Sequence, residues 1–106
     1  MTKWKAAKVQ WHDADSDPTA FNDIIERLKS NNLYEIHVGC DSHKIGGVYI
    51  FAVVIAGYVQ RRGGTFFFHR KRSKDNALSS ISFRLMKEAE LALEIAHSLN
   101  AAFPLR

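Results

Sequence analysis

Two acidic side chains occupy positions where a carboxylate could do chemistry. Asp41 ends a predicted strand, and Glu88 lies inside the apolar stripe of a predicted helix, between Ile95 and Leu99 on a helical wheel. An ionised carboxylate in apolar surroundings is costly unless it finds a cation, a hydrogen-bond donor or a shifted pKa. If the helix packs on the sheet face that bears Asp41, the two carboxylates meet. They would then suit a hard divalent cation such as Mg²⁺ or Mn²⁺, which prefers oxygen ligands.

Each carboxylate also has a structural interpretation. Asp41 could start a turn in which its side chain accepts backbone hydrogen bonds. Glu88 could form a salt bridge with a lysine or arginine of the sheet, or reach water from the edge of the stripe. With these alternatives open, Asp41 and Glu88 are the predicted metal ligands and catalytic residues.

A second group of candidate residues is basic. The formal net charge is +4 at pH 7, which permits an anionic partner. Positive charge is concentrated between residues 61 and 74, beside the phenylalanines at 66–68, and basic residues next to aromatic rings can hold a nucleic-acid backbone and stack on bases. The alternative is a phenylalanine triplet in the core and a charged hairpin that is only solvated. The predicted nucleic-acid-binding residues are Arg61, Arg62, Arg70, Lys71 and Arg72.

Other residue types indicate no further site. The single cysteine, Cys40, excludes an internal disulfide and favours a reducing, cytoplasmic location. The five histidines show no zinc spacing. The aspartates at 13, 15 and 17 lack the glycine and the later acidic ligand of a calcium loop, so they predict a solvated turn that ends in a helix cap. The longest apolar run, 48–58, is about half the length of a membrane helix, so no membrane partner is expected.

A small set of elements must position these residues. Residues 1–17 show no periodicity and predict an irregular arm. Asp17 and Pro18 predict a helix start, and apolar spacing continues that helix over 18–30. Alternation predicts a strand over 33–41. The run 48–58 predicts a second strand, apolar on both faces and therefore covered on both sides, and 65–71 predicts a third.

The last predicted element is a long helix over 78–99, followed by a short tail over 100–106. Its apolar stripe comprises Leu78, Ile81, Leu85, Ala89, Ala92, Ile95, Ala96 and Leu99. Short turns between the three strands predict antiparallel neighbours. The sequence therefore predicts one α/β domain over 1–106, in α+β order. It is a three-stranded antiparallel meander with an N-terminal helix and a long C-terminal helix packed on the sheet.

The order and spacing of these segments resemble a known family. The stretch IHVGCDSH at 36–43, the apolar strand 48–58, GGTFFF at 63–68 and RLMKE at 84–88 resemble the YkuK-like proteins, uncharacterised bacterial members of the ribonuclease H-like superfamily. The resemblance covers about 20–99 and implies the first part of a ribonuclease H-like fold. It also implies that Asp41 matches the first-strand aspartate, and Glu88 the first-helix glutamate, of that superfamily's acidic cluster.

The resemblance carries an expectation about activity. The superfamily's further acidic ligands belong to a fourth strand and beyond, and two-metal hydrolysis needs enough carboxylates to fix two ions. We therefore expect a divalent-metal-dependent domain that acts on or binds nucleic acid and is incomplete as a catalyst. The alternative is a non-catalytic module that binds nucleic acid or self-associates, forming a homo-oligomer through an exposed sheet edge or apolar face.

Overall fold

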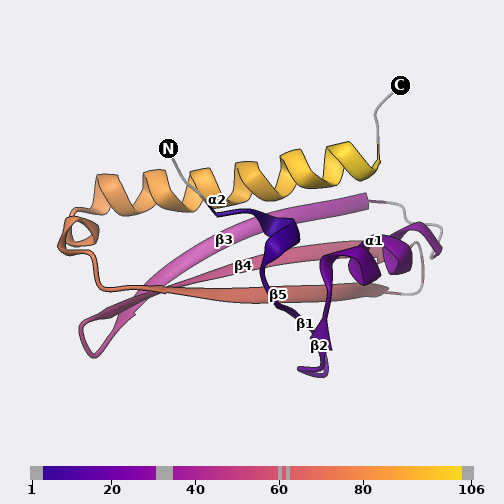
Figure 1. The fold of residues 1–106 in the computed structure, drawn as a ribbon, viewed down its shortest axis with the longest axis horizontal. Coiled ribbons are helices and arrows are strands. Elements are labelled where there is room, and N and C mark those ends of the chain that lie inside the picture. Colours follow the sequence, from indigo (N-terminus) through magenta and orange to yellow (C-terminus); the bar gives the residue numbers. More distant parts are fainter. Residues whose placement is uncertain (1–3, 31–34, 60, 62, 104–106) are drawn as a thin grey trace.

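The computed structural model describes residues 4–30, 35–59, 61 and 63–103. Within these residues five strands form one antiparallel sheet in the order β2-β1-β5-β4-β3 (Figure 1). The elements in chain order are η1 (Ala6–Lys8), β1 (Trp11–Asp13), β2 (Pro18–Thr19), α1 (Phe21–Ser30), β3 (Glu35–Ile45), β4 (Val48–Val59), β5 (Gly63–Ser73), η2 (Asn76–Ser79) and α2 (Ile81–Ala102). The predicted meander is present as β3–β4–β5. The prediction of only three strands is wrong, because β1 and β2 extend the sheet beyond β5.

Strand β1 comes from the segment predicted to be irregular, and β2 from the start of the predicted helix over 18–30. They pair with each other around a turn in which the Asp13 carboxylate accepts hydrogen bonds from the backbone N–H groups of Asp15 and Asp17. The aspartate cluster is therefore a turn, as predicted, but it does not cap the helix. Pro18 lies in β2, and α1 begins only at Phe21. A proline is compatible with a short edge strand because no neighbour needs its missing N–H.

Strand β3 is longer than predicted. It continues through Ile45 and pairs with β4 around a two-residue turn formed by Gly46 and Gly47. Both glycines have positive φ, at 55° and 80°, which matches the tight hairpin turns that follow the twist of the strands. Asp41 is therefore an internal strand residue paired with Ala52, and the interpretation that it starts a turn is wrong.

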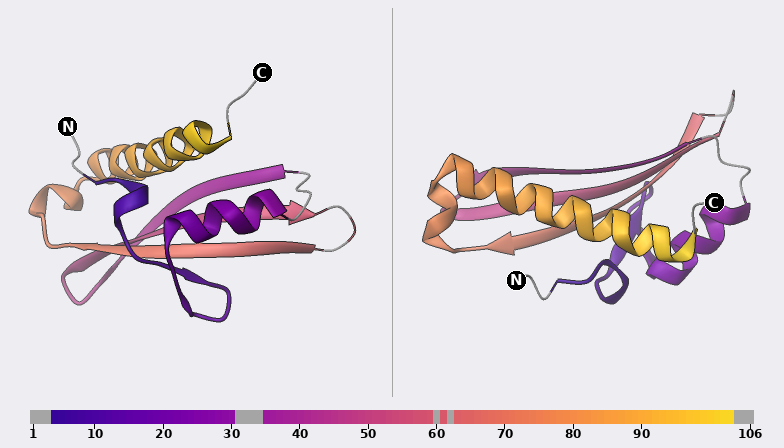
Figure 2. Two further views of the ribbon diagram at one scale, coloured as in Figure 1. Left: turned by 45° about the vertical axis from the view of Figure 1, so that its right-hand side comes forward. Right: turned by 90° about the horizontal axis from the view of Figure 1, so that it is seen from above.

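Both helices cover the same face of the sheet. Figure 2 shows α1, α2 and the N-terminal segment on one side of the strands. The side chains of β4 and β5 that face them are buried, namely Tyr49, Phe51, Val53, Ile55 and Phe67. In the described part of the chain no helix covers the opposite face, which we call the open sheet face. The expectation of a sheet covered on both sides is therefore wrong.

The stripe through which α2 packs agrees only in part with the predicted one, which contains Ile95 and Leu99 but not Leu91. Leu91, Ile95 and Leu99 are its buried residues, whereas Ile81 and Leu85 are exposed. Apolar residues surround most of this helix, so periodicity could not select the face that packs. Its ends also differ from the prediction, because Leu78 belongs to η2 and the helix continues past residue 99 to Ala102.

The N-terminal segment is attached to α2 by a carboxylate. The backbone N–H of Ala6 donates to Glu94 Oε2 at 2.8 Å, and the Ser98 hydroxyl donates to the same oxygen at 2.9 Å. The indole N–H of Trp11 in turn donates to the Ala6 carbonyl at 2.8 Å. Ala6 and Trp11 are fully buried. These bonds hold β1 in place beside β5.

Candidate functional site

Glu88 is half-buried where α2 crosses β3. The hydroxyl of Ser42 on β3 donates a hydrogen bond to its Oε2 atom. A half-buried carboxylate needs a hydrogen-bond donor or a cation, and Ser42 is the donor here. The contact also fixes which side of β3 faces the helix, namely the side of Cys40 and Ser42.

Asp41 lies on the other side of β3. Successive side chains of a strand point to opposite faces, so Asp41 belongs to the open sheet face, in a cross-strand row with Ala52 and Arg70. It is exposed there. The structure therefore does not bring Asp41 and Glu88 to a common face. Among the residues described, no group of three or more His, Cys, Asp or Glu side chains could hold a metal ion.

Cys40 lies beside both carboxylates. Burial is the main reason that the pKa of its thiol rises to about 12, and the negative charges of Glu88 and Asp41 raise it further. At neutral pH this thiol is protonated and is a poor nucleophile. It is interpreted as a packing residue, and its ionisation reports on the two nearby charges.

The alternation of β5 sorts the predicted basic and aromatic residues onto two faces. Phe67 is fully buried under the helices, and Lys71 shares its side of the strand. Phe66, Arg70 and Arg72 point to the open sheet face, where Phe66 is 41% exposed. The phenylalanine triplet is therefore neither wholly core nor wholly surface.

Aromatic rings cross the open sheet face from strand to strand. The Tyr58 ring makes edge contacts with His37 on β3, at 5.2 Å between centroids, and with Phe66 on β5, at 6.1 Å. Farther along β5, the Phe68 ring stacks against His12 at 5.6 Å. Tyr58 is 40% exposed. The face thus presents accessible ring surface near the β4–β5 turn.

Arginines follow these rings toward the other end of β5. The guanidinium carbon of Arg70 lies 4.7 Å from the centroid of the Phe68 ring, at the distance of a cation–π contact. Beyond it is a hollow of about 560 Å³ at the β3–β4 turn. The hollow is lined by Ile45, Val48, Ile50, Arg72, Ser73 and Lys74. Its lining combines three aliphatic side chains with two cations.

The charges of the open sheet face are divided between its two sides. Arg70 and Arg72 lie on β5, whereas Asp41 lies on β3 two strands away. The other acidic side chain of β3 on this face, Glu35, contacts the His37 ring at 2.8 Å. A polyanion would therefore follow β5 and avoid β3.

The five predicted nucleic-acid-binding residues do not form one patch. Arg61 is exposed in the β4–β5 turn, with a φ of 65°. It lies nine residues before Arg70, which at about 3.3 Å per strand residue is roughly 30 Å away. Lys71 faces the helices, and Arg62 lies outside the described residues. Among the described residues of the predicted five, Arg70 and Arg72 are the two that the alternation of β5 places on the open sheet face.

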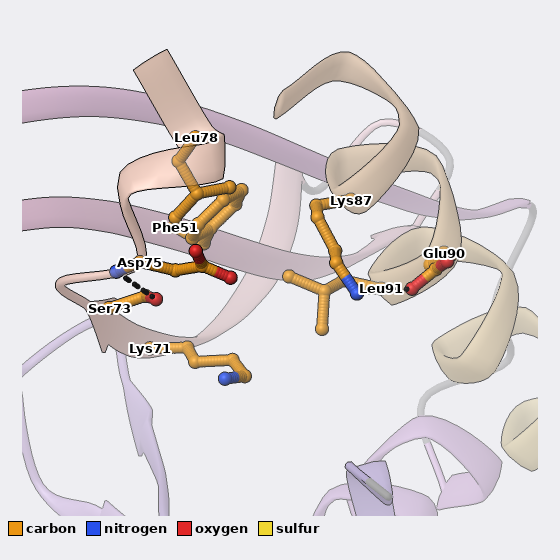
Figure 3. Close-up of a pocket in the computed structure, with 8 residues that line it drawn as sticks. All are labelled: Phe51, Lys71, Ser73, Asp75, Leu78, Lys87, Glu90 and Leu91. Atoms are coloured by element: carbon orange, nitrogen blue, oxygen red, sulfur yellow. Dashed lines mark hydrogen bonds and ion pairs between the residues drawn. The ribbon is translucent and has the colours of Figure 1, made fainter. Parts of the chain in front are cut away.

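A second hollow, on the helix side, contains the side chain of Lys71. Figure 3 shows this pocket of about 160 Å³ between the end of β5, η2 and α2, lined by Phe51, Lys71, Ser73, Asp75, Leu78, Lys87, Glu90 and Leu91. Two lysines and two carboxylates balance each other there. The Asp75 carboxylate accepts from the Ala77 N–H, and Lys87 pairs with Glu90 at 3.3 Å. These contacts account for most of its polar groups.

Comparison with models of protein families identifies the class of protein to which this fold belongs. A family model described as Ribonuclease H-like matches residues 19–106. The chain therefore belongs to the ribonuclease H-like family, which confirms the superfamily predicted from the sequence. No curated protein and no solved structure matches the chain. None of the described helices has the length and apolar character that a membrane crossing requires.

Sequence reasoning missed several residues of the open sheet face. Tyr58 was assigned to a strand buried on both faces, and His12 to an irregular arm. The alternation of β5 could have predicted this face, because residues two apart on a strand point to the same side. It places Phe66, Phe68, Arg70 and Arg72 on one face. Lys74, which lines the hollow, is distinguished in the sequence only by its charge.

Proposed function

We propose that this ribonuclease H-like domain binds single-stranded nucleic acid along β5 on the open sheet face. The observation that carries the proposal is the alternation of β5, which places accessible rings and arginines together on the uncovered side of the sheet. Stacking platforms edged by cations are the usual means of holding a single strand. Bases in a duplex are already stacked on each other, so the rings favour an unpaired strand.

Each part of the face has a role in this proposal. Bases stack on the exposed rings of Tyr58 and Phe66, which lie next to each other. Arg70, held by its contact with Phe68, and Arg72 contact phosphates. Acidic side chains on β3 keep the backbone of the bound strand on the β5 side.

The predicted Mg²⁺ or Mn²⁺ site is not part of this proposal. Asp41 lies on the open sheet face, whereas Glu88 approaches β3 from the helix side and accepts a hydrogen bond from Ser42. We derive no catalytic step from them. Metal binding at this pair stays a prediction.

The proposed interface is tested by the fluorescence anisotropy of a labelled ten-nucleotide oligouridine. Phe66→Ala should weaken binding about tenfold, because base–aromatic stacking contributes about 1–3 kcal/mol per base. Arg70→Gln should weaken binding and also reduce its salt dependence, because one phosphate contact contributes about 0.7 to the logarithmic salt slope for a single strand.

Matched control variants lie on the helix side. Lys71→Gln removes the same charge as Arg70→Gln from the adjacent position, on the opposite face of β5, and Leu93→Ala removes an exposed apolar side chain from α2. Both should leave the affinity within about twofold of wild type. Equal losses for Arg70→Gln and Lys71→Gln would show that binding is non-specific. Affinity for duplex RNA above that for oligouridine would also contradict the proposal.

A further inference from the structure

Next to its buried stripe, α2 has an exposed side that is apolar. Ile81 is 67% exposed, Leu85 56%, Met86 55% and Leu93 69%, and these four are most of the large exposed hydrophobic residues among those described. Ala89 lies among them and is also exposed. We call these five residues the outer face of α2.

The outer face carries no charge. At 100° per residue its members span an arc of about 140° of the helix, and the other residues in that arc are Ser82, Ala92, Ala96, Asn100 and, at the same angle as Ile81, the buried Leu99. A solvent-facing side of a surface helix usually carries charged residues. Monomeric proteins seldom expose a contiguous apolar patch of more than a few hundred Å². The outer face of α2 therefore has the character of an interface.

We infer that the outer face of α2 binds the same face of a second copy, with the two helices antiparallel. The argument is the symmetry of its spacing. Leu85 and Leu93 lie four residues on either side of Ala89. A two-fold axis through Ala89 thus places each Leu85 against the partner subunit's Leu93, and the small alanine lets the helices approach closely. A surface that matches itself under a two-fold rotation forms a closed dimer.

The area of the outer face fits such a dimer. Each of the four large side chains has about 100 Å² of apolar surface to remove from water, or roughly 800 Å² for two copies. The alanines and flanking residues bring the total near the roughly 1,000 Å² that a specific interface needs. An interface of this size should form a weak dimer.

The free edge of β3 is a poorer surface for self-association. It is eleven residues long, but its side chains include Glu35, His37, Asp41, His43 and Lys44. Charged side chains on an edge strand oppose pairing with another strand. Helix α2 also runs along β3 (Figure 1). The apolar face of the helix is therefore the favoured contact.

Sedimentation velocity over a range of protein concentrations tests the inference, which is independent of nucleic-acid binding. Leu85→Lys and Leu93→Glu should each weaken dimerisation about 100-fold, because a charge would be buried at the helix contact. Mixing the two variants should restore a dimer, because the introduced lysine of one copy then faces the introduced glutamate of the other. Ile45→Lys, at a site 57% exposed on the β3–β4 hairpin, is the matched control and should leave the dimer intact.

The variants alter exposed positions, and circular dichroism checks that they fold. Recovery of the dimer on mixing supports the antiparallel register, since a parallel pair would not place residue 85 against residue 93. A protein that stays monomeric up to about 0.5 mM would overturn the inference. So would a dimer that resists both α2 substitutions but dissociates with Ile45→Lys.

Discussion

The hydrogen bond from Ser42 explains how a carboxylate, Glu88, is accommodated in the apolar stripe of α2. Glu88 was recognised as a carboxylate in an apolar stripe, and that recognition was sound because the residue is half-buried. Its partner could not be predicted. The sequence does not say which face of β3 meets α2, and a shift by one residue exchanges Asp41 for Ser42 at the contact.

The thiol of Cys40 provides a test of the metal prediction. With its pKa at about 12, alkylation by iodoacetamide at pH 8 should be about a thousandfold slower than for an unperturbed thiol, because the thiolate is the reactive form. Asp41→Asn and Glu88→Gln should each accelerate the reaction, because a nearby negative charge is lost. The unfolded protein is the control for intrinsic reactivity.

The same assay detects a bound ion. An ion held by Asp41 and Glu88 would lower the pKa of the thiol, so Mg²⁺ or Mn²⁺ would speed alkylation of the wild type and not of Asp41→Asn. A rate unchanged by millimolar Mn²⁺ would exclude the predicted ion site. Rapid alkylation of the metal-free wild type would instead contradict the burial of Cys40.

Glu94 provides a residue-scale test of the N-terminal packing. Glu94→Ala should lower the free energy of unfolding by about 1–3 kcal/mol, because the buried N–H of Ala6 loses its acceptor. Glu90→Ala removes a carboxylate that pairs with the partly exposed Lys87 and should cost about 0.5 kcal/mol or less. Urea denaturation measures both. Equal effects would show that the Ala6 bond does not hold the N-terminal segment.

Helices and strands that are long enough to show a hydrophobic period could be predicted from the sequence. The alternation of β3, the apolar run of β4 and the long α2 are each recognisable in sequence and are confirmed as elements. Strands β1 and β2 have three and two residues, too few for any period, and they form because Asp13 closes their turn. The first turn of α1 was misplaced because an Asp-Pro pair is compatible with a strand as well as with a helix start.

The face on which an element packs is harder to predict than the element itself. In α2 the choice between two apolar sides depends on the tertiary position of the helix over β3. Ile95→Ala should therefore cost about 2–5 kcal/mol of unfolding free energy, since Ile95 is fully buried. Leu93→Ala, two residues earlier and 69% exposed, should cost about 0.5 kcal/mol or less in the monomer.

Thermal and urea unfolding of the two α2 variants, at concentrations below dimerisation, distinguishes the two stripes. A larger loss for Leu93→Ala would mean that the helix packs through its other side. The proposed outer face would then belong to the core, and the inferred dimer would have no surface.

For the whole molecule, the arrangement separates two surfaces. The helices occupy one side of the sheet and leave the other uncovered (Figures 1 and 2). A dimer formed through α2 would therefore leave both open sheet faces accessible. Self-association and nucleic-acid binding should not compete, and a substitution that abolishes one should leave the other unchanged.

The most direct test of the proposed interface is NMR titration of the ¹⁵N-labelled protein with oligouridine, at a concentration where it is monomeric. We predict that the side-chain Nε–H signals of Arg70 and Arg72 shift, together with the backbone amides around Phe66, while the amides of Leu85 and Leu93 do not move. Shifts confined to α2, or no shift at Arg70 on saturation, would contradict binding on the open sheet face.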